Sequence, residues 1–368
     1  MNPFRAFRHA LYLKASQYIA RATLVEGTIK DSDQLFRCLF IDNSKLTEYL
    51  LPKIYSGEPR ILRRSRVWFF SLRRLIQHSR ESLDMCIAVV PLRYDAHFNE
   101  MYDFRSQEWV QQILDVSANA ERLGSPSKNK LHGTKRKIKK FGFSYRVSHD
   151  RQDLFRFYHN MYLPLIRKNF GNWASVDSFE EMEEYFARGF LLLVTQEGQD
   201  VAGVLCWQRD DALIYRRAGV LNGDDLCIQQ GGQSAAYYFM IEEARRKNIK
   251  KLDLMLSRPL RYDGVYRHKR DWGAAVFPND ESKSWVYFFN LGSPKKVALF
   301  FERNPIIATT KTGLKGIVGV KNGCELSPEL ENELTKEFFS PGLEGLIVLT
   351  PNQTAPLHID FNKNQSGG

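Results

Sequence analysis

The stretch FLLLVTQEGQDVAGVLCWQRDDALIYRRAGVLNGDDLCIQQGGQS, residues 190–234, decides the fold of the chain. It contains three apolar runs, at residues 190–195, 201–207 and 213–220, with short polar segments between them. Short apolar runs separated by Gly, Asp and Gln are typical of β-strands joined by hairpins. The stretch therefore predicts an antiparallel meander of three strands.

Two adjacent glycines follow the meander, directly before a helical pattern at residues 234–248. Glycine lets backbone N–H groups approach a ligand closely, and the free N–H groups at a helix N-terminus favour phosphate. Taken alone, Gly-Gly before a helix is equally consistent with a plain loop, and the Lys-Ser/Thr of a P-loop does not follow. The candidate phosphate-binding residues are Gln229, Gly231, Gly232, Gln233 and Ser234.

Further elements are predicted on both sides of this stretch. Ser178 and Glu181 have the spacing of a capping box at the start of a helix. The stretch KKLDLML predicts a fourth strand, and VYRHKRDW at residues 265–272 predicts a short helix. Other strands are expected at residues 85–90, 143–147, 274–277 and 285–290. Together the elements predict a mixed α/β fold.

Three segments are expected along the chain. The cluster GSPSKNK at 124–130 has the composition of a loop or linker. We therefore place an N-terminal α/β segment at residues 1–130, a second domain at 131–290 and a small α/β appendage at 291–368. The second domain opens with the basic stretch LHGTKRKIKKF, which predicts a helix with Ile138 and Phe141 facing inward.

The order of these elements resembles the GNAT acyltransferase fold. A three-strand meander, a Gly-rich turn, a helix, a fourth strand and a short helix ending in Trp272-Gly273 occur in that order. The GNAT loop pattern Gln/Arg-x-x-Gly-x-Gly/Ala holds the pyrophosphate of coenzyme A, and Gln229, Gly232 and Ser234 stand in its three places. Ser234 departs from the pattern in the last place. The resemblance implies acyl-CoA, with acetyl-CoA first among donors, and no metal.

Two stretches are similar to the FemAB and CelD/BcsL-like branch of that superfamily. TKRKIKKFGFSYRV is similar to the basic helix and strand that open its catalytic half. DGVYRHKRDWGA is similar to its Tyr-Arg-Phe-Lys-x-x-x-Gly signature, with His268 in the place of Phe. Fem-type proteins contain two GNAT-like halves in tandem, so residues 1–130 are expected to be a degenerate first half.

The resemblance implies transfer of an acyl group to an amine, which needs an oxyanion stabiliser and an acid for the leaving group. Lys269 stands where many GNAT enzymes place the Tyr that protonates the leaving thiolate. A lysine can donate a proton or hold a developing oxyanion, although its ordinary role is that of a solvated surface residue. We favour the functional role for Lys269.

Five other residues near Lys269 are candidates. Asp263 either accepts a proton from the amine or caps the helix that follows it. His268 has a pKa range suited to a general base, but replacement of a packed Phe is the simpler reading. Tyr266 either packs in the protein interior or donates from its hydroxyl group. Ser257 and Arg258 are candidate substrate-binding residues. The Arg258 guanidinium group can donate two hydrogen bonds to a carboxylate or phosphate.

The net charge of +11 favours anionic partners, namely nucleic acid, lipid headgroups or a phosphorylated cofactor. The excess lies in the first two segments, since residues 291–368 carry 8 basic and 8 acidic side chains. An apolar stripe at the N-terminus fits either an interfacial helix on a bilayer or, as we favour, a helix packed on its own domain. The stripe consists of Phe4, Phe7, Leu11, Ala15, Tyr18 and Ala22.

The five cysteines form no CxxC pair, and the eight histidines form no metal-ligand spacing. No apolar run approaches the roughly 20 residues of a membrane span. We therefore expect a cytoplasmic protein, at most peripheral to the inner membrane face, with no metal. G-x-S-x-G hydrolase and HExxH metalloenzyme motifs are also missing from the sequence.

Three functions remain open. The first is an acyl-CoA-dependent N-acyltransferase that acts on an amine acceptor, such as an amino sugar or a cell-envelope or polysaccharide precursor. The second is Fem-type aminoacyl transfer from aminoacyl-tRNA. The third is a non-enzymatic module that binds nucleic acid or a membrane surface through RILRRSRVWFF and TKRKIKKFGF.

Overall fold

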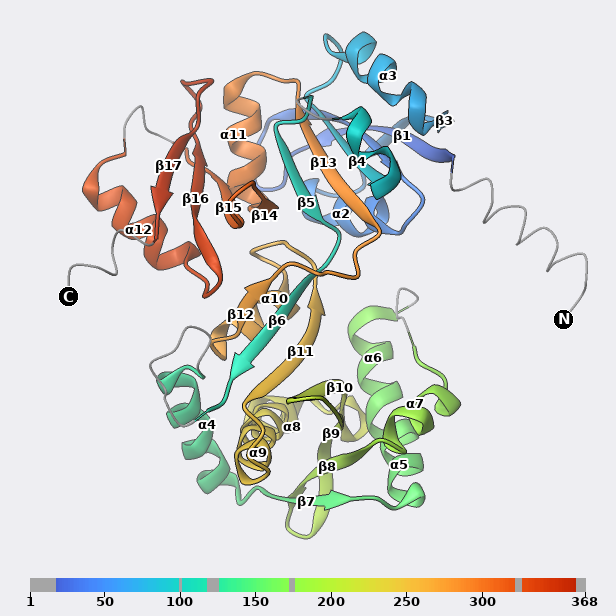
Figure 1. The fold of residues 1–368 in the computed structure, drawn as a ribbon, viewed down its shortest axis with the longest axis vertical. Helices are drawn as coiled ribbons and strands as arrows, with labels where there is room; N and C mark the ends of the chain where they lie inside the picture. Colours follow the sequence, from blue (N-terminus) through green and yellow to red (C-terminus); the bar gives the residue numbers. More distant parts are fainter. Residues whose placement is uncertain (1–17, 99–100, 118–125, 172–175, 322–325, 362–368) are drawn as a thin grey trace, which may run out of the picture.

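The computed structural model describes residues 18–98, 101–117, 126–171, 176–321 and 326–361 of the 368-residue chain. Two lobes lie one above the other, and a smaller unit lies beside the upper lobe (Figure 1). Long strands pass through the narrow region between the lobes (Figure 1). The mixed α/β fold class is confirmed.

The upper lobe is built on a six-stranded sheet with the order β3-β1-β2-β4-β13-β5. Within it, β1 and β2 are antiparallel, whereas β2 and β4 are parallel. Its strands are β1 (Ile19–Thr28), β2 (Leu35–Asp42), β3 (Arg60–Trp68), β4 (Met85–Pro91), β5 (Phe104–Gln107) and β13 (Ser284–Asn290).

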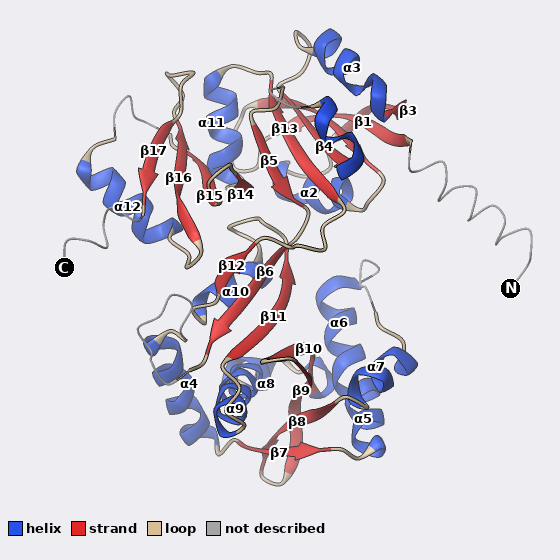
Figure 2. Ribbon diagram, in the orientation of Figure 1, coloured by secondary structure: helices blue, strands red, loops and turns tan. Residues whose placement is uncertain are grey.

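Helices cover both faces of this sheet (Figure 2). One face packs against α2 and α11, and the other against the short helices η1 and η2 and helix α3. These helices are α2 (Leu46–Ile54), η1 (Phe69–Ser71), α3 (Leu72–Ser79), η2 (Leu92–His97) and α11 (Pro294–Arg303).

The lower lobe is built on a seven-stranded sheet with the order β12-β6-β11-β10-β9-β8-β7. The predicted meander is confirmed, because β8, β9 and β10 are consecutive antiparallel neighbours. Its strands are β6 (Val110–Asp115), β7 (Ser144–Ser148), β8 (Gly189–Gln196), β9 (Gln199–Arg209), β10 (Ala212–Val220), β11 (Lys251–Ser257) and β12 (Ala275–Phe277).

The helices of the lower lobe lie on two sides of its sheet (Figure 2). Helices α4 and α9 pack on one face, and α5, η3 and α7 pack on the other. They are α4 (Lys128–Phe141), α5 (Arg151–Phe157), η3 (Tyr158–Tyr162), α6 (Leu163–Phe170), α7 (Phe179–Phe186), η5 (Leu221–Gly223), α8 (Asp225–Gln230), α9 (Gly232–Arg246) and α10 (Gly264–Asp271). The capping box of Ser178 and Glu181 is present at α7.

The two sheets have matching strand orders. In each, an antiparallel pair is followed by a parallel strand, which is β4 beside β2 and β11 beside β10. Beyond it lie two antiparallel strands, β13 and β5 in the upper lobe and β6 and β12 in the lower lobe. The chain therefore contains two sheets with the same strand arrangement, one after the other.

Each half gives one strand to the other. β6 precedes the second half in sequence but lies in its sheet, and β13 follows the second half but lies in the first sheet. The strand at 110–115 thus belongs to the sheet of the segment expected after residue 130. The strand at 284–290 belongs to the sheet of the segment expected before residue 131. Pairing between strands so far apart in sequence leaves no local pattern, and the division into three segments stays a prediction.

The appendage has its own four-stranded sheet, β14-β15-β16-β17, with one parallel pair between β15 and β16. Its elements are β14 (Ile306–Thr309), β15 (Leu314–Gly319), α12 (Pro328–Phe338), β16 (Leu343–Leu349) and β17 (Leu357–Asp360). Buried residues of α12 and the sheet form a core that also includes Tyr266 of α10.

Two sequence-based expectations need correction. The linker expected at 124–130 contributes to α4, because the Ser127 hydroxyl accepts the Lys130 N–H and caps the helix, which begins at Lys128. Ala22, placed on a helical stripe, lies in strand β1. Residues 1–17, which carry most of that stripe, lie outside the described residues. Ile138 and Phe141 pack against the core as expected.

Candidate active site

The glycine pair forms a junction between two helices. Gln229 and Gln230 belong to α8 and were wrongly expected in a loop, because Asp224 caps an extra helical turn after β10. Gly231 has φ of 104° and ends α8. This left-handed conformation favours glycine. At Gly232, an added Cβ would lie 2.5 Å from the Cys227 sulfur, so α9 can pack this closely only with glycine there.

The N-terminus of α9 has no side-chain cap. Helix α9 is 15 residues long, and the first amides of a helix have no intrahelical acceptor. The helix dipole adds a partial positive charge at this end. Gln233 and Ser234 lie in the first turn and are partly exposed. The geometry suits a phosphate group.

A lysine from α4 reaches this junction. The Lys137 ammonium group donates to the Gln229 carbonyl oxygen at 3.0 Å, and its side chain passes over Gly231. A cavity of about 760 Å³ opens beside α8 and is lined in part by Gln230, Asp224 and Asp225. The cavity lining also includes Lys168 and Glu197, whereas Lys137 lies outside it, so the positive charge of Lys137 acts at the glycine junction itself.

A gap between strands lies next to the junction. β10 and β11 pair at three positions, from Ala212 with Lys251 to Ile214 with Asp253. β10 continues to Val220, whereas β11 bulges and pairs with β6. Within the described part of the chain, the β11-facing edge of β10 has no strand partner beyond Ile214. An extended ligand with amide groups can pair with such an edge.

Aromatic side chains from three elements line the neighbourhood of this gap. The rings of Tyr215 of β10 and Tyr237 of α9 lie against each other, with centroids 4.7 Å apart. Burial raises the pKa of Tyr215 and of Tyr237 well above the usual tyrosine value, so both phenols remain protonated. Tyr237 stacks on Trp272, with ring centroids 5.4 Å apart. Gln233 in the first turn of the same helix is partly exposed, and its contact with a cofactor stays a prediction.

Lys269 lies under the bulge of β11. Its ammonium group is buried and donates to the carbonyl oxygens of Met255 (3.1 Å) and Leu256 (2.9 Å) and to the Ser257 hydroxyl (2.9 Å). Burial lowers the pKa of Lys269 to about 7, against the opposing charges of Asp253 and Asp263. This value suits proton transfer at neutral pH. All three donors are engaged, so transfer requires release of one bond.

The carbonyl groups that Lys269 holds belong to a strained backbone. Met255 has φ of 66°, which is uncommon for a residue other than glycine. The Met255 N–H donates to the Asp253 carboxylate at 2.8 Å. Lys269 and Asp253 therefore fix the bulge at which β11 leaves β10.

Asp263 caps α10. Its carboxylate accepts the backbone N–H groups of Val265 (3.0 Å) and Tyr266 (3.2 Å). It also accepts the Tyr49 hydroxyl and lies 3.7 Å from the Lys53 ammonium group. Burial, followed by this hydrogen bond, raises the pKa of Tyr49. Asp263 thus joins the lower lobe to α2 of the upper lobe, and a role as base stays a prediction.

Tyr266 connects α10 to the appendage. It is fully buried, donates to the Ser340 hydroxyl at 2.9 Å and accepts from the Arg261 guanidinium group at 3.1 Å. The same arginine donates to the Phe338 carbonyl oxygen at the end of α12 at 2.5 Å. These contacts give Tyr266 a structural role in the described part of the chain.

His268 packs edge-on against Tyr237, with ring centroids 4.9 Å apart. Burial, with the nearby charge of Lys130, lowers the pKa of His268 to about 4, so the imidazole is neutral at pH 7. Among the described residues, neither its Nε2 atom nor the buried Nε1 of Trp272 has a hydrogen-bond partner. His268 occupies the packed position expected for Phe.

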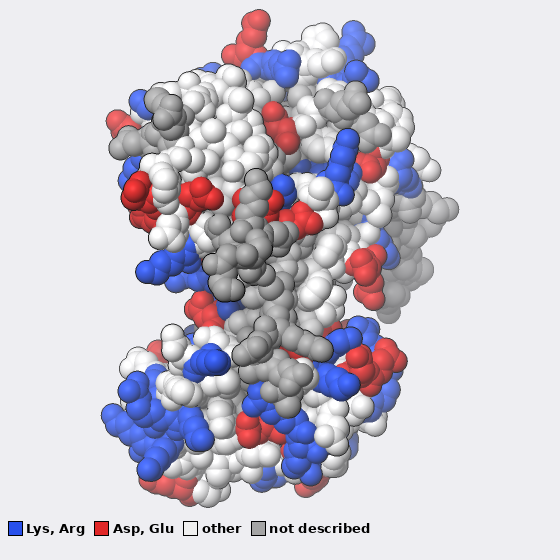
Figure 3. Space-filling view, turned by 60° about the vertical axis from the view of Figure 1, so that its left-hand side comes forward, with Lys and Arg blue, Asp and Glu red and all other residues white. Residues whose placement is uncertain are grey.

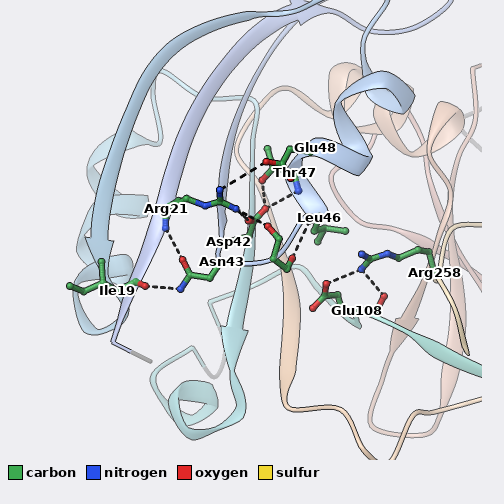
Figure 4. Close-up of polar contacts among 10 residues, drawn as sticks. Ile19, Arg21, Asp42, Asn43, Leu46, Thr47, Glu48, Glu108 and Arg258 are labelled. Carbon is green, nitrogen blue, oxygen red and sulfur yellow. Dashed lines mark hydrogen bonds and ion pairs between the residues drawn. The ribbon is translucent and has the colours of Figure 1, made fainter. Parts of the chain in front are cut away.

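Arg258 lies in the region between the lobes. Its guanidinium group donates to the Glu108 carboxylate at 2.9 Å (Figure 4). The same group lies 3.8 Å from the centre of the Trp109 ring. Ser257 is buried and holds Lys269. Both predicted substrate-binding residues therefore have internal partners, and their contact with a substrate stays a prediction.

Sequence reasoning missed a group of charges on β10. Arg216 and Arg217 share the carboxylate of Asp177, at 3.0 and 2.5 Å, and both side chains are mostly buried. Arg216 also lies over the Tyr185 ring at 4.1 Å. Two guanidinium groups against one carboxylate leave an excess positive charge beside the gap. The adjacent arginines at a β-bulge were the signal for this cluster.

The helix that follows β2 in the first half, α2, has a capped N-terminus. The Asp42 carboxylate at the end of β2 accepts the N–H and hydroxyl of Thr47 in the first turn of α2 (Figure 4). Arg21 lies 3.4 Å from the same carboxylate. Because Asp42 occupies the helix N-terminus with a negative charge, an anionic ligand is disfavoured there.

The described residues contain no group of three or more His, Cys, Asp or Glu side chains that could hold a metal ion. Within the same residues, no helix is long and apolar enough to span a membrane. Lys and Arg side chains gather densely on the lower lobe (Figure 3). Helix α4 contributes exposed Lys135, Arg136, Lys139 and Lys140 to the basic character of this lobe.

No protein-family model and no curated protein matches the chain. Solved structures similar to it include FemX, which is 12% identical with a TM-score of 0.38 over 74% of this chain and 85% of that one. L-PGS from Bacillus licheniformis is 8% identical, with a TM-score of 0.36 and coverage of 72% and 83%. A tandem GNAT protein from the clavulanic acid biosynthesis pathway is 10% identical, with a TM-score of 0.30 and coverage of 69% and 77%. The likeness between the two halves of this chain is the matching strand order of their sheets.

Proposed function

We propose that the protein is a GNAT-like N-acyltransferase of the FemAB and CelD/BcsL-like branch that moves an acyl group from acyl-CoA to an amine. The observation that carries the proposal is the uncapped N-terminus of α9, with Gly231 in the left-handed conformation and Lys137 beside it. In this proposal the pyrophosphate of the donor lies against the amides of Gly232, Gln233 and Ser234. Acetyl-CoA is the first donor to test.

The gap between β10 and β11 supports the same donor. A pantetheine arm carries two amide groups and is extended, so it can pair with the open edge of β10 beyond Ile214. The thioester would then lie near the bulge at Met255, within reach of the residues that Lys269 positions. There the lysine would hold the oxyanion or supply a proton to the leaving thiolate.

The acceptor in this proposal is an amine on an amino sugar or on a cell-envelope or polysaccharide precursor. The amine must lose a proton before it attacks the thioester carbonyl. Arg216 and Arg217 supply an excess positive charge on β10, which favours an acceptor that also bears a carboxylate or phosphate. Asp263 remains the candidate base, although its present contacts are those of a helix cap.

A second candidate is Fem-type transfer from aminoacyl-tRNA. The observation in its favour is the basic surface of α4, which lies next to the same helix N-terminus through Lys137. A polyanionic donor would contact Lys135, Arg136 and Lys139 together. A cytoplasmic location suits both donors.

Isothermal titration calorimetry with acetyl-CoA and with aminoacyl-tRNA separates the two enzyme readings. Saturable binding of acetyl-CoA, and protection of α9 by free CoA, support the first. Binding of charged tRNA with no heat from acetyl-CoA would replace it with the second. Binding of neither donor, together with binding of uncharged nucleic acid or lipid vesicles, would favour the non-enzymatic reading.

A further inference from the structure

A second basic surface lies on the upper lobe, far along the molecule from the gap between β10 and β11 (Figure 1). Residues 60–80, RILRRSRVWFFSLRRLIQHSR, contain seven arginines and no acidic residue. They form β3, η1 and α3, and all seven arginine side chains are exposed. We call the exposed arginines of this stretch, together with Trp68 and Phe70, the arginine–aromatic surface.

Most of these arginines have no internal role. The guanidinium groups of Arg60, Arg63, Arg64, Arg66, Arg73 and Arg74 make no hydrogen bond or ion pair with any residue that the structure describes. The buried arginines of the lower lobe behave differently, as Arg216 and Arg217 show by sharing Asp177. The upper charges are therefore available to an external anion.

The position of β3 explains part of this charge. β3 is the edge strand of its sheet, and arginine on an edge strand discourages pairing with another chain. That explanation does not extend to α3, nor to the aromatic side chains that follow β3. Trp68 and Phe70 are 48% and 64% exposed, and their rings stack on each other at 5.5 Å. Exposed aromatic rings would add to aggregation unless a partner covers them.

Further apolar and basic side chains surround the two rings. Phe69, between them, stacks on Tyr94 of η2, and its N–H donates to the Tyr18 carbonyl oxygen. Tyr18 and Leu92 are exposed at 50% and 43%, and Arg93 lies over both tyrosine rings.

We propose that the arginine–aromatic surface docks the protein on an anionic lipid bilayer. Arginines bind lipid phosphates, and Trp and Phe with an aliphatic neighbour are the side chains that enter the interfacial region of a bilayer. A nucleic acid would need free ring faces for its bases, whereas Trp68 and Phe70 cover one another. The surface lies apart from the proposed transfer site, so the inference holds for either donor.

Vesicle flotation with the full chain tests the proposal. The probes are vesicles of phosphatidylcholine alone and of equal parts of phosphatidylcholine and phosphatidylglycerol. We expect binding only to the anionic vesicles, and we expect the triple substitution Arg63→Gln, Arg64→Gln and Arg66→Gln to weaken it roughly a hundredfold, because each arginine near a charged membrane contributes about 1 kcal/mol. Trp68→Ser with Phe70→Ser should also weaken binding, with less change in its dependence on salt.

The matched control is Lys135→Gln, Arg136→Gln and Lys139→Gln on α4, which removes the same charge from a helix without exposed aromatic rings. Its binding to anionic vesicles should change less than threefold, and circular dichroism should show unchanged thermal transitions for all variants. Three results would overturn the proposal: no binding to anionic vesicles, equal losses for the two triple variants, or RNA binding that depends on Arg63 to Arg66 while vesicles do not bind.

Discussion

Each half has a helix that follows the strand beside its parallel strand, α2 after β2 and α9 after β10, and the N-termini of these two helices differ in their capping. In the first half, α2 begins four residues after β2 ends, and the Asp42 carboxylate accepts the Thr47 N–H. In the second half, α9 begins at Gly232 without a side-chain cap, and Lys137 lies beside it. One end is closed by an internal anion, whereas the other is left positive.

The difference teaches how similar strand arrangements can carry either a capped or an uncapped helix N-terminus. A buried carboxylate at a helix start stabilises the fold but excludes a second anion. Glycine before α9 gives up that stabilisation and leaves the N–H groups of the first turn without a capping side chain. We therefore expect donor binding in the second half only.

The largest expected effect concerns Lys269 of α10. This helix follows β11 in the second half, whereas the shorter helix η2 follows the corresponding parallel strand, β4, in the first half. Because burial lowers the pKa of Lys269 to about 7, the folded protein releases a proton that the unfolded chain keeps until about pH 10. The free-energy cost of burying the Lys269 charge is fully present below pH 7, where the lysine is protonated in both states. This cost decreases as the pH rises and the folded protein loses the proton. The free energy of unfolding of the wild type should rise, relative to Lys269→Met, by about 1.4 kcal/mol per pH unit between pH 7 and 9.

Urea unfolding at several pH values measures this difference. Lys336→Met, on the exposed side of α12, is the matched control and should keep the wild-type slope. Equal slopes for the wild type and Lys269→Met would show that Lys269 does not change its protonation state near pH 7.

The second prediction adds a carboxylate at the N-terminus of α9, so that this helix start resembles the acidic start of α2. Ser234→Asp places a carboxylate in the first turn of α9, close to the proposed pyrophosphate position. Repulsion of about 2 kcal/mol at this distance should weaken acetyl-CoA binding about thirtyfold. The thermal transition should not fall, because an acidic residue in the first turn of a helix is favourable.

Ser234→Asn is the neutral control of similar size and should bind acetyl-CoA within a few-fold of the wild type. Calorimetric titration of both variants gives the comparison. Equal affinity of the Asp and Asn variants would place the donor elsewhere.

The third prediction removes the capping carboxylate from the N-terminus of α2 in the first half. Asp42→Ala removes the acceptor of the Thr47 N–H and leaves Arg21 without its closest carboxylate. We expect a loss of about 1–2 kcal/mol in the free energy of unfolding and no new site for acetyl-CoA. Asp42→Asn keeps an acceptor oxygen and should lose less. A second acetyl-CoA site in the Ala variant would show that the closed end is the only difference between the halves.

The smallest expected effect concerns Lys137. Lys137→Met keeps the side-chain stem over Gly231 but removes the charge beside α9. Acetyl-CoA should bind about fivefold more weakly, since one partly exposed charge contributes about 1 kcal/mol, and the salt dependence of binding should decrease. Lys139→Met on the same helix is the control and should leave affinity unchanged. Identical losses of acetyl-CoA affinity in the Lys137 and Lys139 variants would indicate a diffuse electrostatic attraction by α4 in place of a specific contact of Lys137.

The sequence predicted the elements whose pattern is local. The meander of β8 to β10, the capping box at Ser178 and the inward positions of Ile138 and Phe141 all follow from neighbouring residues. The exchange of β6 and β13 was not predictable, because each strand pairs with residues far away in sequence.

The site was predictable to a smaller degree. The glycine pair and Lys269 stand out by residue type, whereas Lys137 approaches Gly231 across 94 positions in the chain and Asp177 meets Arg216 only after folding. The internal contacts of Asp263 and Tyr266 depend on α2 and on the appendage. No local pattern distinguishes a capping aspartate from a catalytic one.

Hydrogen–deuterium exchange with and without acetyl-CoA tests the contrast between the two helix starts most directly. Our account predicts slower exchange for the amides of residues 232–234 in the presence of acetyl-CoA and no change for residues 46–48 at the start of α2. Protection at the start of α2, or saturating acetyl-CoA with no protection at the start of α9, would contradict it.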